Sequence, residues 1–248
     1  MSATLGWKLN RLRAMDFAEV RWRLRQALAA GLERRGLGLA RARAPEPGAG
    51  VTGAAWLAAM PVEFDSEPYV EAADRVLAGR WDVLALRDCA LGFPPRWNRD
   101  PKTGIEAPLA FGKAIDYRDS AIVGDIKYLW EPGRHLELVT LAQAWRLTRE
   151  ARYAEGARRL LESWLEQCPY PRGPHWSSAL ELGVRLVNWA CAWHLLGGER
   201  SPLLAGEAGR AFRRRWLDAV YRHCHFISRN LSRYSSANNH LFGELTGL

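Results

Sequence analysis

The sequence lacks the cysteine patterns that build metal or disulfide frameworks. Its four cysteines lie far apart and none belongs to a C-x-x-C pair; they are Cys89, Cys168, Cys191 and Cys224. Zinc modules and disulfide scaffolds need cysteine or histidine at short, regular spacing. His223 and His225 stand two residues apart on a predicted helix, so they point to different sides and are poorly placed to share one ion. We expect neither a metal nor a cofactor.

Long apolar runs are also missing. A helix that spans a membrane needs about 20 mainly apolar residues, and no stretch of this sequence approaches that length. A signal peptide needs an uninterrupted apolar core, whereas arginines are spread through residues 1–36. The chain as given is therefore expected to be soluble or at most associated with a surface, with no transmembrane segment.

Lysine is rare, so arginine supplies most of the basic charge. The lysines are Lys8, Lys102, Lys113 and Lys127, yet the net charge is +8 and the isoelectric point is about 9.7. A basic excess favours an anionic partner, such as nucleic acid, a membrane surface or an acidic polysaccharide. Solvated arginine-rich helix faces explain the same excess without any partner. Because no basic–aromatic recognition motif is present, nucleic acid is not expected as the partner.

Hydrophobic residues are plentiful, at 48% of 248 residues with 12 tryptophans, which is enough for a sizeable core. The length suits one large domain, or one domain and part of another. We divide the chain into a basic N-terminal helix with a linker, residues 1–50, and a helical domain, residues 51–248. Apolar residues recur at helical spacing over 16–34. That helix either lies on a membrane surface or docks onto the main body, and we favour docking; residues 40–50 predict a linker.

The rest of the chain predicts an all-α fold. A helix is expected over 66–78, with Ser66 as its N-cap, followed by a short strand over 81–86 and an ordered loop or surface excursion over 91–108. Apolar residues then recur at helical period over 132–148, 151–167, 177–196 and 201–230. Pro132 and Pro202 would occupy first helical turns. Long helices with short connectors predict antiparallel pairs, in a rhythm like that of a toroid or solenoid.

The predicted helix over 177–196 is apolar nearly all round, so we expect it to be buried. Its exceptions form one narrow stripe, because Ser177, Glu181, Arg185 and Asn188 follow the helical repeat. Unpaired polar groups are costly to bury. Either Glu181 and Arg185 form an i,i+4 pair that satisfies the stripe, or the stripe lines a polar canyon, with Trp176 at its mouth.

The segment "GDIKYLWEPGRH", residues 124–135, mixes aromatic and charged side chains where a helix begins. Tyr128 and Trp130 suit stacking on sugar rings, and Arg134 suits a carboxylate or sulfate. Glu131 before Pro132 is equally consistent with a simple acidic helix start.

Asn238, Asn239 and His240 stand together where a last helix begins. Asn238 fits the position of an ordinary N-cap. The free N–H groups of a helix start also favour an anion. An amide and an imidazole there can hydrogen-bond the carboxylate of a uronic acid and hold it near neutrality. That acidifies the adjacent C5–H, as β-elimination of a uronide requires.

Three segments together, "GDIKYLWEPGRH", "HWSSALELGVRLVNW" and "NNHLFGELTGL", resemble the N-terminal helical domain of the heparinase II/III-like polysaccharide lyases. The resemblance covers residues 111–248 well and the N-terminal part loosely. It implies an incomplete (α/α) toroid that precedes a C-terminal antiparallel β-sandwich, with an acidic polysaccharide in the cleft between them. It also implies that Asn239 and His240 neutralise the uronate carboxylate. Tyr128, Trp130, Arg134, Trp176, Glu181, Arg185, Asn188 and Asn238 are the expected substrate-binding residues.

The sequence departs from the family pattern at its C-terminal end. The family's catalytic Tyr, its catalytic His and the β-sandwich would follow Leu248, and neither Tyr128 nor Tyr234 matches the catalytic motif. General acid–base catalysis contributes about a hundred- to ten-thousandfold, so we expect this polypeptide alone to be inactive or nearly so. It would be the substrate-binding part of a lyase; a non-catalytic acidic-glycan-binding module and a structural helical-repeat protein are the alternatives. The family implies a bacterial periplasm, but the residues leave the compartment open.

Overall fold

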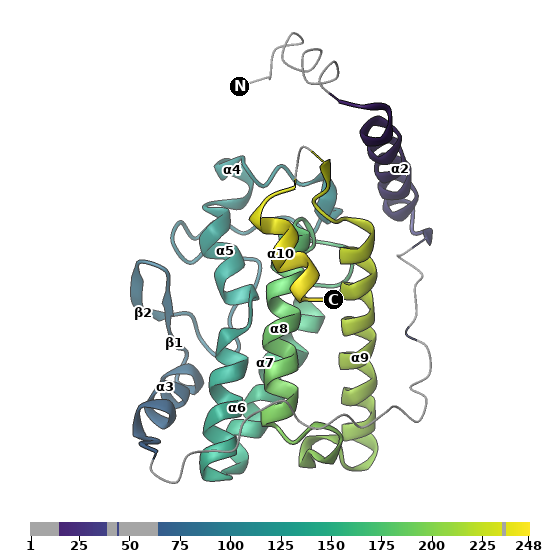
Figure 1. Ribbon diagram of the computed structural model, residues 1–248. Coiled ribbons are helices and arrows are strands. Elements are labelled where there is room, and N and C mark those ends of the chain that lie inside the picture. Colours follow the sequence, from purple (N-terminus) through teal and green to yellow (C-terminus); the bar gives the residue numbers. More distant parts are fainter. Residues whose placement is uncertain (1–14, 39–43, 45–63, 235–236) are drawn as a thin grey trace.

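The computed structural model describes residues 15–38, 44, 64–234 and 237–248, and these are mostly helical (Figure 1). The predicted all-α class is confirmed. The α-helices are α2 (Phe17–Arg34), α3 (Glu67–Leu77), α4 (Ser120–Val123), α5 (Ile126–Gly133), α6 (Leu136–Thr148), α7 (Ala151–Gln167), α8 (Ala179–Leu195), α9 (Gly206–Arg229) and α10 (Asn239–Thr246). Short 3-10 turns cover Gly112–Ala114, Pro174–Trp176, Gly198–Arg200 and Pro202–Leu204. Apart from Ala44, the predicted linker lies outside the described residues.

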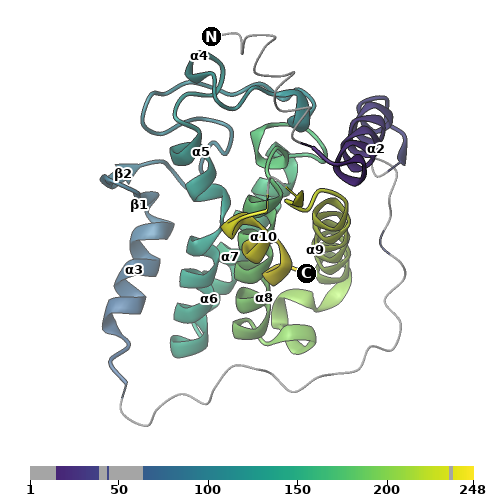
Figure 2. The same cartoon turned by 45° about the horizontal axis from the view of Figure 1, so that its top comes forward.

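Helices α6 and α8 lie side by side and run in the same direction, while α7 and α9 run against them (Figures 1 and 2). The start of α6 meets the middle of α8, where Trp189 donates a hydrogen bond to His135. The end of α6 meets the end of α8, where Trp145 lies against Gly197. The predicted antiparallel pairs, α6 with α7 and α8 with α9, are therefore present.

Helix α7 shows why these residues form buried amphipathic helices. Its buried positions follow the helical repeat; they are Tyr153, Ala154, Gly156, Ala157, Leu160, Leu161 and Trp164. The charged residues between them are exposed or half-buried. Burial of each large apolar side chain stabilises the fold by about 1.5–3 kcal/mol. Helix α8 is apolar on more of its circumference because α6, α9 and α10 all contact it.

The core also contains a cluster of one arginine and three histidines with no solvent exposure: Arg185, His135, His175 and His223. Tryptophan rings surround them, and the Arg185 guanidinium lies 4.4 Å from the centre of the Trp164 ring. Burial, together with the Arg185 charge, lowers the pKa of all three histidines, that of His175 to about 3. The imidazoles are therefore neutral in the folded protein at neutral pH.

Several predicted boundaries are wrong. Residues 81–86 do not form one strand: β1 (Arg80–Val83) and β2 (Leu86–Ala90) form an antiparallel hairpin whose turn includes Leu84. Pro132 is not in the first turn of a long helix but near the end of α5, and the chain turns at His135, which has a left-handed backbone, before α6 begins. Pro202 begins a 3-10 turn, and α9 starts only at Gly206. Ser66 stands at the N-cap of α3, but its side chain makes no capping hydrogen bond.

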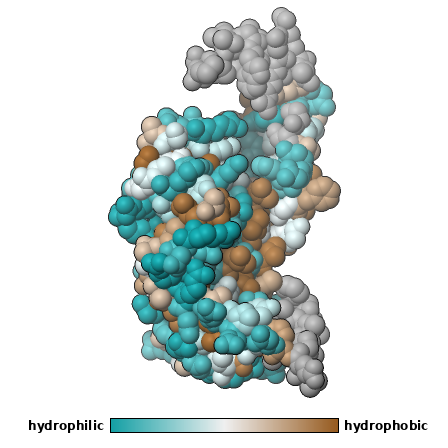
Figure 3. Space-filling view, turned by 90° about the vertical axis from the view of Figure 1, so that its left-hand side faces the viewer, coloured by the Kyte–Doolittle hydropathy of each residue, from teal (hydrophilic) through white to brown (hydrophobic). Residues whose placement is uncertain are grey.

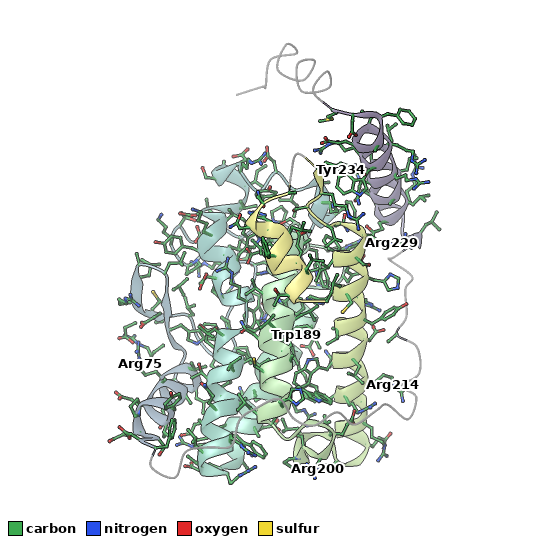
Figure 4. The ribbon with its side chains drawn as sticks, in the orientation of Figure 1. Arg75, Trp189, Arg200, Arg214, Arg229 and Tyr234 are labelled. Carbon is green, nitrogen blue, oxygen red and sulfur yellow. The ribbon has the colours of Figure 1, made fainter. Side chains whose placement is uncertain are left out.

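Helix α2 lies at the edge of the molecule (Figure 1) and touches the body through its polar side. Glu33 accepts a hydrogen bond from the Tyr170 hydroxyl, and Gln26 donates one to the backbone of Arg229. The Trp22 ring packs 5.9 Å from that of Tyr234. Figure 4 shows Arg229 and Tyr234 on the side of the body that faces this helix. Among the described residues, no helix has both the length and the apolar character needed to span a bilayer.

Candidate functional site

Asp100 fixes the place where α5 begins. This residue has no solvent exposure, and its carboxylate accepts hydrogen bonds from the backbone N–H of Asp125, at 2.7 Å, and from the Thr103 hydroxyl. Gly124 just before has a positive φ, and a Cβ there would collide with Asp100. The Asp125 carboxylate then caps α5 at Lys127. The predicted excursion over 91–108 is therefore an ordered loop that positions α5.

One face of α5 remains accessible. At about 100° per residue, Lys127, Trp130, Glu131 and Arg134 fall within an arc of roughly 100°, and none of them is buried. The indole N–H of Trp130 donates to the carbonyl of Pro174 at 3.1 Å, which fixes the ring. The face therefore offers an oriented aromatic ring beside charged side chains.

Glu181 pairs with Arg134, and not with Arg185 as one interpretation of the stripe predicted. Arg134 donates to both carboxylate oxygens of Glu181, at 2.8 and 3.1 Å, and to Glu131 at 2.8 Å. The Glu181 hydrogen bonds are the main cause that raises the pKa of Arg134. Two carboxylates thus share one guanidinium, so the cluster carries a net negative charge.

The polar stripe of α8 is directed at the end of α5. Arg185 donates to the carbonyl of Gly133 and Asn188 donates to that of Arg134, which satisfies carbonyls left open where α5 ends. Ser177 bonds to the carbonyl of Pro174. The stripe therefore has protein partners along its length and does not line an open canyon.

Three of the predicted substrate-binding residues are buried: Glu181, which is 3% exposed and bonded to Arg134, and two residues inside the core. Trp176 is 2% exposed and donates its indole N–H to the carbonyl of Cys168. Arg185 has no exposure and shares a 3.0 Å contact with Nε2 of His223. Neither side chain presents a surface to a ligand from solvent, so their role in a site can only be support.

Asn238, Asn239 and His240 are all exposed at the start of α10. The Asn238 carboxamide oxygen accepts the backbone N–H of His240 at 2.8 Å and so caps the helix. Farther along α10, the buried Glu244 accepts hydrogen bonds from the backbone and the hydroxyl of Ser232. The helix start is therefore anchored while its polar side chains face solvent.

Glycines bring α10 onto α8. A Cβ on Gly183 would lie 2.3 Å from the carbonyl oxygen of Gly243, and one on Gly247 would lie 2.5 Å from Cα of Gly183. Gly183 lies roughly 160° around α8 from both Glu181 and Arg185 at about 100° per residue. Helix α10 therefore contacts α8 on a different face from the one that carries the stripe. In both ribbon views the start of α10 lies on the α5 side of α8 (Figures 1 and 2).

Sequence reasoning missed two contributors near α5. The Lys102 ammonium lies 4.6 Å from the centre of the Tyr128 ring and pairs with Asp125 at 2.8 Å. The Tyr117 ring packs 5.3 Å from that of Trp130. Both residues lie in irregular segments, where no periodicity marks them; the scarcity of lysine was the one available signal for Lys102. Within the described residues, no group of three potential ligands is arranged to hold a metal ion.

Comparison with known families gives one match. The family described as "Heparinase II/III N-terminus" matches residues 98–248. The chain belongs to this family. No curated protein and no solved structure matches the chain.

Membership of the heparinase II/III family makes the chain a polysaccharide-lyase-related domain. The matched range begins earlier than the predicted resemblance and includes residues 98–108 of the loop that positions α5, as well as α4 to α10. It leaves out α2, α3 and the hairpin. The accessible face of α5 and the start of α10 both lie inside it.

Proposed function

We propose that this chain is the helical substrate-binding part of a lyase that cleaves uronate-containing acidic polysaccharide by β-elimination. The accessible α5 face and the α10 start would bind the polymer together. The single observation that carries this proposal is the exposed Asn238–Asn239–His240 group at a rigidly docked helix start on the α5 side of α8. Alginate and glycosaminoglycans are the substrate classes that offer such uronates.

The helix arrangement supports an incomplete (α/α) toroid. In a toroid, successive inner helices run in the same direction and each pairs with an antiparallel outer helix. Helices α6 and α8 have this relation, with α7 and α9 as their outer partners. Helix α10, which packs on α8, would be the next inner helix. The family resemblance implies that a β-sandwich closes the cleft from the other side and so is the intramolecular partner.

The site residues would have different roles, which depend on whether their charges are already paired within the protein. Arg134 is shared by two carboxylates, so its guanidinium is held in place but attracts an anion weakly. The exposed Lys127 ammonium, the Asn239 amide, the His240 imidazole and the N–H groups of the α10 start would take the uronate carboxylate. Trp130 and Tyr128 would contact the sugar rings. Glu181, Arg185, Asn188 and Trp176 would hold α5 and α8 in register beneath this surface.

Replacement of Asn239 and His240 by alanine is expected to weaken binding of alginate or heparin by tenfold or more. Each hydrogen bond to a charged group contributes about 1.5–3 kcal/mol. Titration calorimetry with the 248-residue chain measures the affinity, and neutral dextran should not bind. Thr246→Ala, at the other end of α10, is the matched control and should bind as the native chain does. Equal affinity of N239A/H240A and native protein would refute the proposed site.

Turnover separates the lyase from the alternative, a non-catalytic acidic-glycan-binding module. The ultraviolet absorbance of the unsaturated product reports β-elimination directly. We expect these 248 residues to bind the polymer with little or no turnover, because no tyrosine of theirs matches the catalytic motif. Robust turnover by this polypeptide would contradict that expectation. In a longer form that has the remaining catalytic groups, loss of turnover in N239A/H240A would favour the lyase over the binding module.

A further inference from the structure

Helix α2 carries its apolar side chains on the face that points away from the protein. Phe17 is 82% exposed, Leu24 61%, Leu28 70% and Leu32 48%. At about 100° per residue these four fall within an arc of roughly 80°. The contacts with the body come from Trp22, Gln26 and Glu33, on nearly the opposite side. The docking predicted from the sequence is thus present, but through the polar face, and the apolar stripe is left open.

The charged side chains of α2 are also divided between the inner and the outer face of the helix. Both of its acidic residues face inward: Glu19 and Glu33 are 5% and 6% exposed. Arg21, Arg25, Arg34 and Arg35 are exposed instead, and no ion pair of theirs is found within the described residues. Arg21 and Arg25 lie within or beside the apolar arc, where their long stems can reach past the leucines. The outer face of the helix therefore combines exposed leucine and phenylalanine with positive charge.

We propose that the outer face of α2 binds the surface of an anionic lipid bilayer. A helix with an apolar face bordered by arginines lies in the interface plane, with its apolar side chains between the headgroups and its cations against anionic lipid. Because α2 stands at the edge of the body (Figure 1), a flat surface can reach this face. The inference does not depend on the proposed polysaccharide site, which lies on other helices.

Two other occupants fit the observations less well. A second copy of this chain would bring two arginine-bearing faces together, and like charges oppose that contact. An acidic polysaccharide would pair with the arginines but would leave the leucine stripe in water. Anionic lipid alone matches both the apolar and the basic side chains.

Co-sedimentation of the full chain with vesicles tests the proposal. Vesicles of phosphatidylcholine with phosphatidylglycerol should bind the chain, vesicles of phosphatidylcholine alone should bind it at least tenfold more weakly, and added salt should reduce the binding. Leu24→Gln/Leu28→Gln keeps the charge and should weaken binding tenfold or more. Leu136→Gln/Leu245→Gln alters two leucines of similar exposure on other helices and should bind as the native chain does.

The outcomes also distinguish the rival occupants. L24Q/L28Q should retain the native circular dichroism and thermal transition, since both leucines are exposed. Native vesicle affinity in that variant would overturn the proposal. So would a native dimer, found by sedimentation equilibrium, that L24Q/L28Q dissociates while vesicles do not bind. Polysaccharide affinity that falls in Arg21→Gln/Arg25→Gln, with no vesicle affinity in the native chain, would also overturn it. None of these results depends on lyase activity or on Asn239 and His240.

Discussion

Near pH 5 the free energy of unfolding should fall by about 2.7 kcal/mol for each pH unit of acidification. Unfolding there takes up a net two protons, because three histidines gain a proton and Glu137 loses one. His135, His175 and His223 have a lowered pKa in the folded protein because burial and the Arg185 charge oppose their protonation. In the unfolded chain they take up three protons as the pH falls through about 6.5. The stability they contribute is therefore present above pH 6.5 and is lost progressively below it, toward the folded pKa of His175 at about 3.

Glu137 partly offsets this loss of stability, because it releases one proton when the protein unfolds. Its Oε2 is buried without a hydrogen-bond partner, and burial raises its pKa to about 8. Between pH 8 and about 4.5 the folded protein thus holds a proton that the unfolded chain does not. Stability from this group rises as the pH falls through that window, by about 1.4 kcal/mol per unit. Unfolding near pH 5 takes up a net two protons. Maximum stability is expected near pH 7, where the three histidines of the unfolded chain together bind about one proton, as Glu137 does in the fold.

Denaturant titrations between pH 4.5 and 8 measure this profile. His135→Gln should reduce the acid slope by about 1.4 kcal/mol per pH unit, while its amide can still accept the Trp189 hydrogen bond. Glu137→Gln should remove the fall in stability that is expected between about pH 7 and pH 8. Leu138→Met, a buried change in the same helix, should lower stability without changing either slope. A profile that stays level from pH 6.5 to pH 5 would show that the imidazoles can be protonated in the fold.

The second large effect is expected from Gly183→Val. The new Cβ would lie 2.3 Å from the carbonyl oxygen of Gly243, a backbone atom that cannot swing aside. Helix α10 must therefore leave α8, and the Asn239–His240 pair moves with it. Overpacking of this kind costs roughly 1–3 kcal/mol, but the aromatic core around Trp164 does not depend on α10. We expect a folded body in which amides 239–246 exchange freely and acidic polysaccharide binds at least tenfold more weakly.

Hydrogen exchange measured by mass spectrometry, together with calorimetry, checks both halves of this expectation. Gly31→Ala is the matched control, because no heavy atom lies within 4 Å of a Cβ at that exposed helical position. Alanine there should be neutral or stabilising by up to about 1 kcal/mol. Native protection of α10 in G183V would mean that the two backbones are not in contact as described. Loss of protection with unchanged binding would remove α10 from the site.

Much of the fold could be predicted because helical periodicity reports burial. Helix α7 matched its predicted limits, and the family resemblance rested on segments that do meet in space, as Arg134 and Glu181 show. The hairpin was missed because its turn lacks the Asn-Gly or Asp-Gly pair typical of tight hairpins; it passes through Leu84, an unusual residue at positive φ. The break at His135 was missed for a related reason. A left-handed residue between two helices leaves the apolar period almost unchanged.

The site was less predictable than the fold, because a stripe on one helix does not say which partner faces it. Glu181 and Arg185 have the spacing of an i,i+4 pair, yet each takes its partner from the end of α5. The three buried histidines are far apart in sequence and meet only through packing around Arg185. The outward apolar face of α2 was equally hidden, since periodicity reveals an amphipathic helix but not which of its faces meets the body.

The hairpin has a consequence for how the molecule behaves in concentrated solution. Among the described residues β1 and β2 form a sheet of two strands, so the outer edge of each strand lacks a strand partner. Such edges invite another chain to add a strand and begin a polymer. Here Arg75, Arg80, Asp82 and Asp88 form exposed ion pairs along the hairpin. An incoming strand would have to strip water from these charges, so the hairpin should resist edge-to-edge assembly.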